Sequence, residues 1–421
     1  MLLAAAWMGL AAQAAQLPAS RREIVVDPRG PLATLTQAIA AARPGDRVTV
    51  HAGVYREPEI VVDKRVTILG VDGPVFDGQG THQVITVKAD SVTIRGLVIR
   101  NVGASGTEDR AGIKVVERTG CDLEDNVLLD TYFGIYLSKS TDCTVRHNRF
   151  RGRGTTESLS GNAIHSWSSS RLVIEDNDIA GHRDGIYFEF TTGARVRHNR
   201  SRHNLRYGLH FMFSNDCEYS DNTFEENGAG VAVMYSGKVT MRGNRFALNQ
   251  GPAAFGLLLK DITDSRIENN VFMGNSVGLH AEGTTRLLVL GNDFERNGWA
   301  ARVMGDAVDN QFHFNRFAGN SFDVATNSAN ASTDFSSNYW DRYEGYDLNQ
   351  DGYGDVPFAP VRLFALVVQQ HPPAIILLQS FLTDLLDLAE RAFPVLTPPA
   401  MADPRPLMTW PAPGRTEAGH Q

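Results

Sequence analysis

The sequence predicts an all-β protein, a right-handed parallel β-helix with a helix at its start and an apolar helix near its end. Three observations predict it. An Asn that closes a short strand recurs at intervals of 22, 29, 22, 23, 22, 26, 22 and 23 residues. The residue 14 positions before this Asn is Gly in seven of nine cases and Ala in two. A second Asn follows five residues later in six of the units. The nine repeat Asn residues are Asn126, Asn148, Asn177, Asn199, Asn222, Asn244, Asn270, Asn292 and Asn315.

Each repeat unit contains two or three short strands with an apolar residue at every second position. Such units are too short and too rich in strands for helical solenoids or propeller blades. Stacked as coils of a parallel β-helix, ~4.8 Å apart, they bury one continuous core. Asn side chains then satisfy backbone groups at the corners, where Gly supplies the torsion angles. The two longer intervals carry insertions between coils, at 152–158 and 251–255.

The residues before the repeats predict how the β-helix begins. Leu35, Ala38, Ile39 and Ala42 share one face of a predicted helix that ends near Gly45. A helix over the first coil covers an otherwise open sheet edge. This opening resembles that of pectin-lyase-like β-helices. We expect the β-helix, with rungs of about 22 residues, to occupy residues 23–340.

Residues 1–15 are expected to form a secretory signal peptide. They contain a short apolar run and a small-residue cleavage pattern, Ala12–Gln13–Ala14. The alternative is a disordered Ala-rich end. No run of 18 uncharged apolar residues follows, so no ordinary membrane-spanning helix is predicted.

Charge and cysteine content narrow the classes of protein. A formal net charge of -8 argues against a nucleic-acid binder, which would carry a basic face. Cys121, Cys143 and Cys217 each lie five residues before a repeat Asn, where other units are mostly apolar. We therefore expect buried free thiols. The alternative is a disulfide or metal site formed by Cys121 and Cys143.

The strand that begins at the repeat Gly carries unusual residues on its outer face. Alternation predicts that positions one and three after the Gly face the core, and that positions two and four face solvent. The first outward column reads Lys114, Tyr136, His165, Tyr187, His210, Ala232, Leu258, His280 and Val303. The second outward column reads Val116, Ser138, Trp167, Glu189, Met212, Met234, Lys260, Glu282 and Gly305.

His210, Met212 and Met234 are the candidate copper ligands. His210 and Met212 are ~6.6 Å apart along one strand, and Met234 lies ~4.8 Å from Met212 on the next coil. Imidazole and thioether ligands together suit Cu(I), a soft ion. His165 and Glu189, on preceding coils, are secondary candidates. The alternative is a Met and aromatic patch that binds a partner protein or lies beneath a loop.

An Asp- and Gly-rich loop, residues 341–360, follows the repeats. Asp347, Asn349, Asp351 and Asp355 match places one, three, five and nine of a calcium-binding loop. Place twelve is Phe358 instead of the usual Glu. The loop is predicted either to bind calcium or to be rich in Asx turns.

An apolar segment, residues 361–394, comes next. Its stretch 373–393 is predicted to be one helix, yet its charged residues argue against an ordinary membrane span. It either caps the last coil or docks on a membrane protein or at the membrane surface. The Pro-rich tail, 395–421, is expected to be extended.

A carbohydrate-active enzyme is the main alternative function, because polysaccharide lyases, hydrolases and epimerases use this fold. Fold alone does not establish an activity. A glycoside hydrolase needs two carboxylates within ~10 Å, whereas Glu189 and Glu282 are four coils apart, ~19 Å. Motifs of polygalacturonases, pectate lyases and alginate epimerases are not found. We therefore expect a non-catalytic protein. A protein-binding scaffold without metal is a further alternative.

The chain as a whole resembles the NosD family. The motifs that carry the resemblance are TLTQAIAAARPGD, GLHFMFSNDCEYSDN, GVAVMYS, NYWDRYEGYDLNQDGYGDVPF and the terminal DPRPLM. The NYWD run followed by an apolar helix is the most specific of them. The resemblance implies a periplasmic accessory protein that is held at the inner membrane through an ABC transporter. Its implied role is maturation of the copper centres of nitrous oxide reductase in denitrification.

The resemblance also implies partners and a cofactor. The partners are the transporter permease, contacted through residues 373–393, a copper chaperone lipoprotein and nitrous oxide reductase. The implied cofactor is Cu(I), and calcium is a further candidate from the loop pattern.

Overall fold

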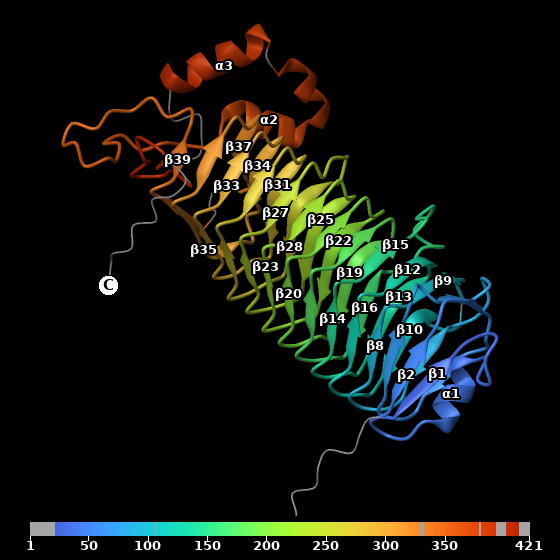
Figure 1. The fold of residues 1–421 in the computed structure, drawn as a ribbon. Helices are drawn as coiled ribbons and strands as arrows, with labels where there is room; N and C mark the ends of the chain where they lie inside the picture. Colours follow the sequence, from blue (N-terminus) through green and yellow to red (C-terminus); the bar gives the residue numbers. More distant parts are fainter. Residues whose placement is uncertain (1–21, 106, 329–331, 379, 393–400, 412–421) are drawn as a thin grey trace, which may run out of the picture.

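A parallel β-helix forms the body of the protein (Figure 1). The structure, a computed structural model, describes residues 22–105, 107–328, 332–378, 380–392 and 401–411. Three sheets run along the axis, and neighbouring strands within each sheet pair in parallel. The predicted β-helix is thereby confirmed. The predicted signal peptide lies outside the described residues.

Each complete coil contributes one strand to each sheet. Sheet A contains β1 Glu23–Val26, β2 Arg47–Val50, β5 Thr67–Gly70, β8 Thr93–Arg95, β11 Asp122–Glu124, β14 Thr144–Arg146, β17 Val173–Glu175, β20 Arg195–Arg197, β23 Glu218–Ser220, β26 Thr240–Arg242, β29 Arg266–Glu268, β32 Leu288–Leu290, β35 Val308–His313 and β38 Ser332–Ser336. Sheet B contains β3 Val54–Tyr55, β6 Val75–Asp77, β9 Val98–Val102, β12 Val127–Thr131, β15 Arg149–Arg151, β18 Asp178–Ala180, β21 Arg200–Arg202, β24 Thr223–Glu225, β27 Arg245–Ala247, β30 Val271–Met273, β33 Asp293–Glu295, β36 Arg316–Ala318 and β39 Tyr339–Trp340. Sheet C contains β4 Ile60–Val62, β7 Ile85–Val87, β10 Ala111–Val116, β13 Phe133–Ser138, β16 Ile164–Trp167, β19 Asp184–Glu189, β22 Tyr207–Met212, β25 Ala229–Met234, β28 Phe255–Lys260, β31 Val277–Glu282, β34 Trp299–Val303 and β37 Phe322–Ala325.

The core follows the predicted alternation. Ile135 and Leu137, one and three residues after a repeat Gly, are fully buried. One row of rings stacks from coil to coil inside sheet B, with centroid distances between 4.2 and 5.7 Å. The row consists of Phe224, Phe246, Phe272, Phe294, Phe317 and Trp340. The three cysteines are buried and free, as predicted. Repetition of one packing contact thus builds the core.

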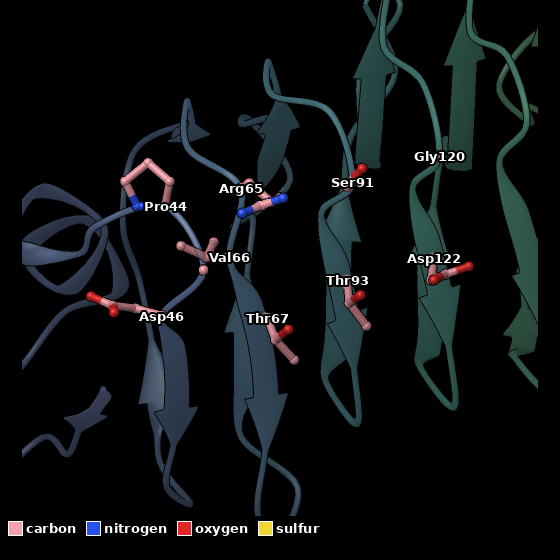
Figure 2. Close-up of a pocket in the computed structure, with 10 residues that line it drawn as sticks. Pro44, Asp46, Arg65, Val66, Thr67, Ser91, Thr93, Gly120 and Asp122 are labelled. Carbon is pink, nitrogen blue, oxygen red and sulfur yellow. The ribbon is translucent and has the colours of Figure 1, made fainter. Parts of the chain in front are cut away.

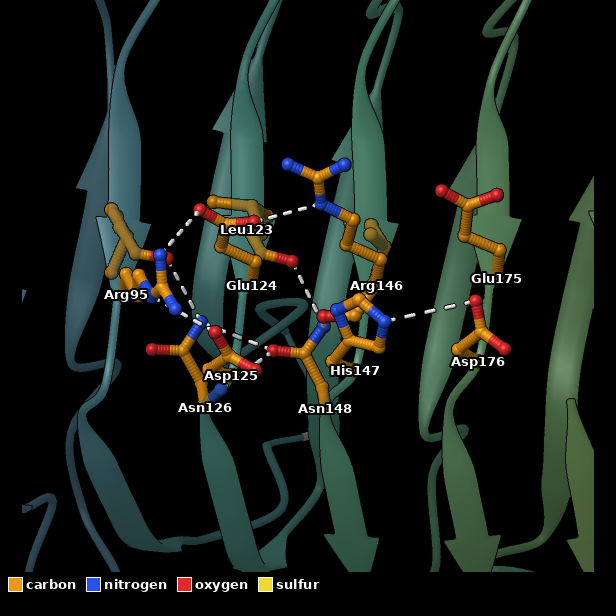
Figure 3. Close-up of polar contacts among 12 residues, drawn as sticks. Arg95, Leu123, Glu124, Asp125, Asn126, Arg146, His147, Asn148, Glu175 and Asp176 are labelled. Atoms are coloured by element: carbon orange, nitrogen blue, oxygen red, sulfur yellow. Dashed lines mark hydrogen bonds and ion pairs between the residues drawn. The ribbon is translucent and has the colours of Figure 1, made fainter.

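The repeat Asn residues form a buried ladder (Figure 3). The backbone N–H of Asn126 and its Nδ2 donate to Asn148 Oδ1 at 3.0 and 3.1 Å. Asn148 makes the same two bonds to Asn177. On the neighbouring surface Glu124 accepts a hydrogen bond from Arg146 at 2.7 Å. The ladder satisfies corner donors that would otherwise be buried without partners.

Helix α1, Leu35–Ala41, covers the first coil (Figure 1). Thr34 Oγ1 accepts from the Gln37 N–H at 3.2 Å and caps the helix. Leu35, Ala38 and Ile39 are buried beneath it, as the one-sided pattern predicts. The helix therefore protects the first sheet edge.

The apolar segment is not one helix. It forms α2, Leu363–Gln370, a 3₁₀ helix η1, Pro372–Leu377, and α3, Phe381–Ala392. The single helix expected over 373–393 was wrong, because Leu378 has an extended backbone, with φ of -57° and ψ of 130°, and ends η1 before α3 begins at Phe381. Residue 393 lies outside the described residues.

Helix α2 caps the last coil, and η1 and α3 lie outside it (Figure 1). Phe364 packs against Phe322 of β37, with ring centroids 6.0 Å apart. In contrast, Ile376 is 85% exposed, Phe381 80% and Leu388 63%. Within the described residues no helix is long and apolar enough to cross a membrane. The segment thus caps the β-helix and still presents an apolar surface.

The described part of the Pro-rich tail, 401–411, returns to the last coil. Leu407 bridges Tyr339 and Tyr353, and Met401 is buried in the core. Asp403 is fully buried and ends the Asn ladder, because its Oδ2 accepts from the Asn338 N–H at 2.9 Å. The tail is therefore an anchored strap over the last coil.

One position in the repeat alignment was wrong. Leu279 pairs with Ala301, so Ala300, not Ala301, occupies the place of the repeat Gly. Consequently Val303 is a buried core residue, and the outward column continues from His280 to Arg302. The coil that contains β34 therefore has one extra residue between this strand and Asn315.

Candidate metal centre

The candidate copper ligands lie on the outer face of sheet C, on β22 and β25. Met212 pairs directly with Met234 across these strands, so the predicted neighbourhood of the two methionines is confirmed. Both side chains are partly exposed. His210 precedes Met212 by two residues on the same face, and its cross-strand neighbour is Ala232.

The first outward column was expected to face solvent, and this was wrong. His165 is 9% exposed, and His210 is 5% exposed. Aromatic rings from the position just before the repeat Gly fold back over this column. Phe133 lies 4.8 Å from the ring of His165, and Tyr207 lies 4.7 Å from the ring of His210. The second outward column, with Met212 and Met234, remains the accessible one.

His165 is separated from the methionine pair. Its Nδ1 is 2.9 Å from Asn162 Nδ2, so one ring nitrogen is engaged. Burial, and then the nearby Arg183 charge, lower the pKa of His165 to about 3, so its imidazole is neutral. Tyr187 lies between His165 and His210 in the column. The structure therefore does not bring His165 to Met212 and Met234.

Glu189, the other secondary candidate, adjoins the pair. It is the cross-strand neighbour of Met212, and its side chain is partly exposed. The second outward column therefore runs Glu189, Met212, Met234 on consecutive coils. Beyond Met234, Lys260 forms an ion pair with Glu282 at 3.5 Å. The structure thus places Glu189 beside the two thioethers, whereas the Glu282 carboxylate is paired with Lys260.

His210 provides the observation that tests whether the residues fit a metal. Its imidazole packs between Tyr187 and Tyr207, with centroid distances of 4.9 and 4.7 Å. Neither ring nitrogen has a hydrogen-bond partner, although both are buried. An unsatisfied buried polar atom costs about 1–3 kcal/mol. A soft cation bound between this imidazole and the thioethers would remove that cost, so the donor set fits Cu(I).

A buried ion pair lies directly behind His210, and the sequence reasoning missed it. Asp184 is fully buried and accepts from Arg206 Nε and Nη2 at 2.9 and 2.6 Å. His210 Nδ1 is 3.8 Å from Asp184 Oδ2, too long for a hydrogen bond. Burial alone would raise the pKa of Asp184, but His210 and Arg206 hold it below its ordinary value. The signal was available, because Asp184 stands where other coils carry Phe133 or Tyr207.

The thioethers are essential to this candidate. Across the described residues no three His, Cys, Asp or Glu side chains converge as a metal site would. The methionines supply the soft ligands that Cu(I) prefers.

The candidate calcium residues use their oxygens within the loop. Asp347 accepts from the Gly352 N–H at 2.9 Å, and Asp355 accepts from the Leu348 N–H at 2.7 Å. Asn349 Nδ2 lies 3.3 Å from Asp351 Oδ2. The same Asp351 oxygen is 3.2 Å from Arg405 in the tail. Asn349 and Asp351 also form Asx turns, because their Oδ1 atoms accept from the N–H two residues later at 3.1 and 2.9 Å. The calcium prediction stays a prediction.

A groove at the other end of the molecule bears on the enzyme alternative (Figure 2). It has a volume of about 570 Å³ and runs across β2, β5, β8 and β11 of sheet A. Its carboxylates, Asp46 and Asp122, come from coils three steps apart, ~14 Å at the spacing of sheet strands. Glycoside hydrolases hold their two carboxylates within ~10 Å, so these two do not form such a pair.

Solved structures of similar shape include carbohydrate-active enzymes. A GH87 α-1,3-glucanase catalytic unit from Streptomyces thermodiastaticus is 16% identical with a TM-score of 0.60, covering 78% of this chain and 70% of that one. A family 28 exopolygalacturonase from Yersinia enterocolitica is 13% identical with a TM-score of 0.55, covering 73% and 78%. At these identities the likeness shows the fold alone.

Sequence relatives decide the family. Residues 151–353 match the family described as "Periplasmic copper-binding protein (NosD)". A Pseudomonas aeruginosa protein named "Probable ABC transporter binding protein NosD" is 30% identical over 385 residues, which span 87% of this chain and 89% of the relative. The chain belongs to the NosD family. A Stutzerimonas stutzeri protein of the same name is 28% identical and covers 87% of each chain. NosD relatives are thus named for binding to a transporter, not for an enzymatic reaction.

Proposed function

We propose that this NosD protein binds Cu(I) at Met212, Met234 and His210 in the periplasm. In this proposal it works with an ABC transporter at the inner membrane in maturing the copper centres of nitrous oxide reductase. Its other partner is a copper chaperone lipoprotein. Glu189 is a secondary ligand on the preceding coil. The observation that carries the proposal is the direct pairing of Met212 with Met234, two residues along the strands from an imidazole without hydrogen-bond partners.

The ligand types support a transfer role. Thioethers hold Cu(I) without forming disulfides, which suits an oxidising compartment. Met212 and Met234 are partly exposed, so a second protein can reach an ion held there. His210 lies deeper, and Tyr187 and Tyr207 restrict the movement of its ring. Two partly exposed ligands and one buried ligand suit an ion that is received and passed on.

Copper titration of the purified full chain tests the site. We expect Met212→Ala combined with Met234→Ala to weaken Cu(I) binding at least about tenfold, measured by competition with a chromogenic Cu(I) chelator. Met273→Ala is the matched control, because Met273 is also partly exposed but lies on β30 of sheet B. Equal affinity of the double variant and the wild type would refute the site.

His210 is tested separately. His210→Phe keeps an aromatic ring between Tyr187 and Tyr207 and removes both ring nitrogens. We expect it to weaken Cu(I) binding while the melting temperature stays the same or rises, since two unsatisfied nitrogens are removed. Unchanged copper affinity would exclude His210 as a ligand and leave the methionines.

The exposed surface of η1 and α3 is the proposed contact with the transporter permease. The proposed docking stretch 373–393 carries large, exposed apolar side chains at Ile376, Phe381 and Leu388. Replacing all three with Ser is expected to abolish co-purification with the co-expressed transporter. The control is Phe314→Ser, which removes an exposed ring outside this segment instead. Retained co-purification of the triple variant would refute docking by this surface.

A further inference from the structure

An exposed ladder of three aromatic rings runs beside the methionine pair. Phe190, Phe213 and Tyr235 directly follow Glu189, Met212 and Met234 at one corner of three consecutive coils. The rings stack with centroid distances of 5.2 and 5.1 Å and interplanar angles of 10° and 15°. Their exposed fractions are 49%, 41% and 42%. We call these three residues the aromatic ladder.

Folding does not require aromatic residues at this corner. All three have a left-handed backbone, with φ of 52°, 50° and 52°, which bulky side chains adopt only at a cost. Other coils place Lys139, Ser168, Asp261 or Gly283 at the same corner. The ladder therefore combines a backbone cost with exposed apolar area. That combination is typical of a binding surface.

Ring geometry selects the class of occupant. Because each ring stacks on the next, the faces between the rings are covered and the ring edges are presented to solvent. A sugar that stacks on an aromatic ring needs an open face, which only the outer faces of Phe190 and Tyr235 could offer, so the ladder as a whole suits a carbohydrate poorly. Ring edges contact aliphatic groups and the sulfur of Met favourably. A polypeptide carrying such side chains matches the ladder better.

The charges at the two ends of the aromatic ladder indicate which residues flank the Met or aliphatic side chains of the partner. Glu189 lies at one end of the ladder and Asp261 lies on the coil after Tyr235. Neither carboxylate has an ion-pair partner within the described residues, whereas most acidic residues on the neighbouring coils do. Two unpaired carboxylates around an apolar strip favour Lys or Arg on the partner.

We propose that the aromatic ladder docks a partner polypeptide that presents Met or aliphatic side chains next to Lys or Arg. The rings supply the apolar contact, and Glu189 and Asp261 set the charge preference. The proposal does not depend on copper ligation, because the ladder is a surface of its own. A partner docked there lies beside Met212 and Met234, which directly precede Phe213 and Tyr235 in the chain.

Binding of labelled synthetic peptides to the full chain, followed by fluorescence anisotropy, tests the proposal. The probe alternates Lys and Met, and the comparison peptides replace Met with Ser or Lys with Glu. The ladder variant is Phe190→Ser, Phe213→Ser and Tyr235→Ser, which uses the residue that Ser168 already places at this corner. We expect the variant to bind the Lys/Met probe at least about tenfold more weakly than the wild type.

A matched control keeps the result specific. Leu248 and Phe314 are each 45% exposed and have left-handed backbones at other corners. Leu248→Ser with Phe314→Ser is expected to leave probe binding unchanged. Equal binding by ladder variant and wild type would overturn the proposal, and so would equal binding of the Lys/Ser peptide. An oligosaccharide such as maltohexaose that binds the wild type and not the ladder variant would assign the ladder to sugars instead.

The two proposals fail separately. The ladder variant is expected to keep wild-type Cu(I) affinity. The Met212→Ala, Met234→Ala variant is expected to bind the copper-free Lys/Met probe within about twofold of the wild type. Loss of copper binding in the ladder variant would show that the rings act on the metal centre and not on a partner.

Discussion

Removing the carboxylate of Asp403 is expected to loosen the carboxy-terminal strap. Its Oδ2 accepts from the Asn338 N–H, Asn338 Nδ2 and Trp340 Nε1 at 2.9, 3.2 and 3.1 Å. Its Oδ1 accepts from the Ser337 and Arg405 N–H groups at 3.1 and 3.0 Å. Asp403→Ala leaves three donors of buried groups without an acceptor. Each unpaired buried donor costs about 1–3 kcal/mol, and water that enters the site can satisfy part of the lost hydrogen bonding. The expected loss of local stability is therefore about 3–5 kcal/mol.

Hydrogen exchange measures this cost where it arises. The Phe358 N–H donates to the Asp403 carbonyl at 2.9 Å, and the Leu407 N–H donates to the Asn338 carbonyl at 2.9 Å. In Asp403→Ala both amides are expected to lose about 100-fold or more of their protection, because 1.4 kcal/mol is a factor of ten. Amides of the central coils are expected to stay unchanged, since coils contact only their neighbours.

A control in the same strap separates the carboxylate from general disturbance. Arg405 pairs with Asp351 at 3.2 Å and lies over the ring of Tyr353, but its side chain is 57% exposed. Arg405→Ala is therefore expected to cost at most about 1 kcal/mol. Protection of Leu407 that falls equally in both variants, or in neither, would refute the reasoning.

Three further predictions follow from other parts of the molecule. Burial raises the pKa of Asp323 to about 6. Its contribution to the stability of the fold is therefore fully present below pH ~4, where the carboxyl is protonated in both the folded and the unfolded chain, and it is lost as the pH rises through 6. Asp323→Asn is therefore expected to stabilise the protein by up to about 3 kcal/mol at pH 8 and by little at pH 4 in urea titrations. No pH-dependent difference would contradict this. Asn222→Ala removes ladder bonds to the Val196 carbonyl and to Asn244, and is expected to cost about 3–5 kcal/mol in the same assay. His198→Ala, at an exposed corner, is expected to change the free energy of unfolding by under about 0.5 kcal/mol. Similar losses in Asn222→Ala and His198→Ala would contradict the role given to the Asn ladder. If the 347–355 loop binds calcium, millimolar calcium raises the melting temperature of the wild type but not of Asp355→Asn. An unchanged melting temperature assigns the loop to Asx turns.

The repeat architecture could be predicted from sequence because its markers are local. Each repeat Asn marks a corner whose donors need an acceptor. Each repeat Gly marks a close approach of backbone, and not the corner torsion first expected, because none of the seven repeat Gly residues has a positive φ. At Gly230, for example, an added Cβ would lie 2.4 Å from the Gly256 carbonyl oxygen. Such constraints recur on every coil, so spacing alone predicted that Met212 and Met234 are neighbours.

The environment of His210 could not be predicted in the same way. Alternation states which side of the sheet a residue faces, but not what lies over it. Burial of His210 depends on Tyr207 folding back from the position before the Gly, and on Asp184 with Arg206 behind it. The slip at Ala300 has a similar cause, because the extra residue lies in the turn after Val303, where Ala307 donates to Met304. Counting back from Asn315 therefore misplaced the strand by one residue.

The end of the Asn ladder explains why residue 403 in the tail motif is Asp and not another Asn. On inner coils each Asn accepts from the coil before and donates to the coil after, so an amide serves both needs. Asn338 has no following repeat Asn, and the groups of the last coil that reach the Asp403 carboxylate are all donors. A carboxylate offers acceptors without a donor, whereas an amide at residue 403 would turn an N–H₂ group toward other N–H groups. The same strap returns the chain to the core at Met401, while Val361 holds it at the other end of the apolar segment. The surface of η1 and α3 is thus tied to the β-helix on both sides. A permease bound to that surface would transmit its movement to the last coil through two attachments.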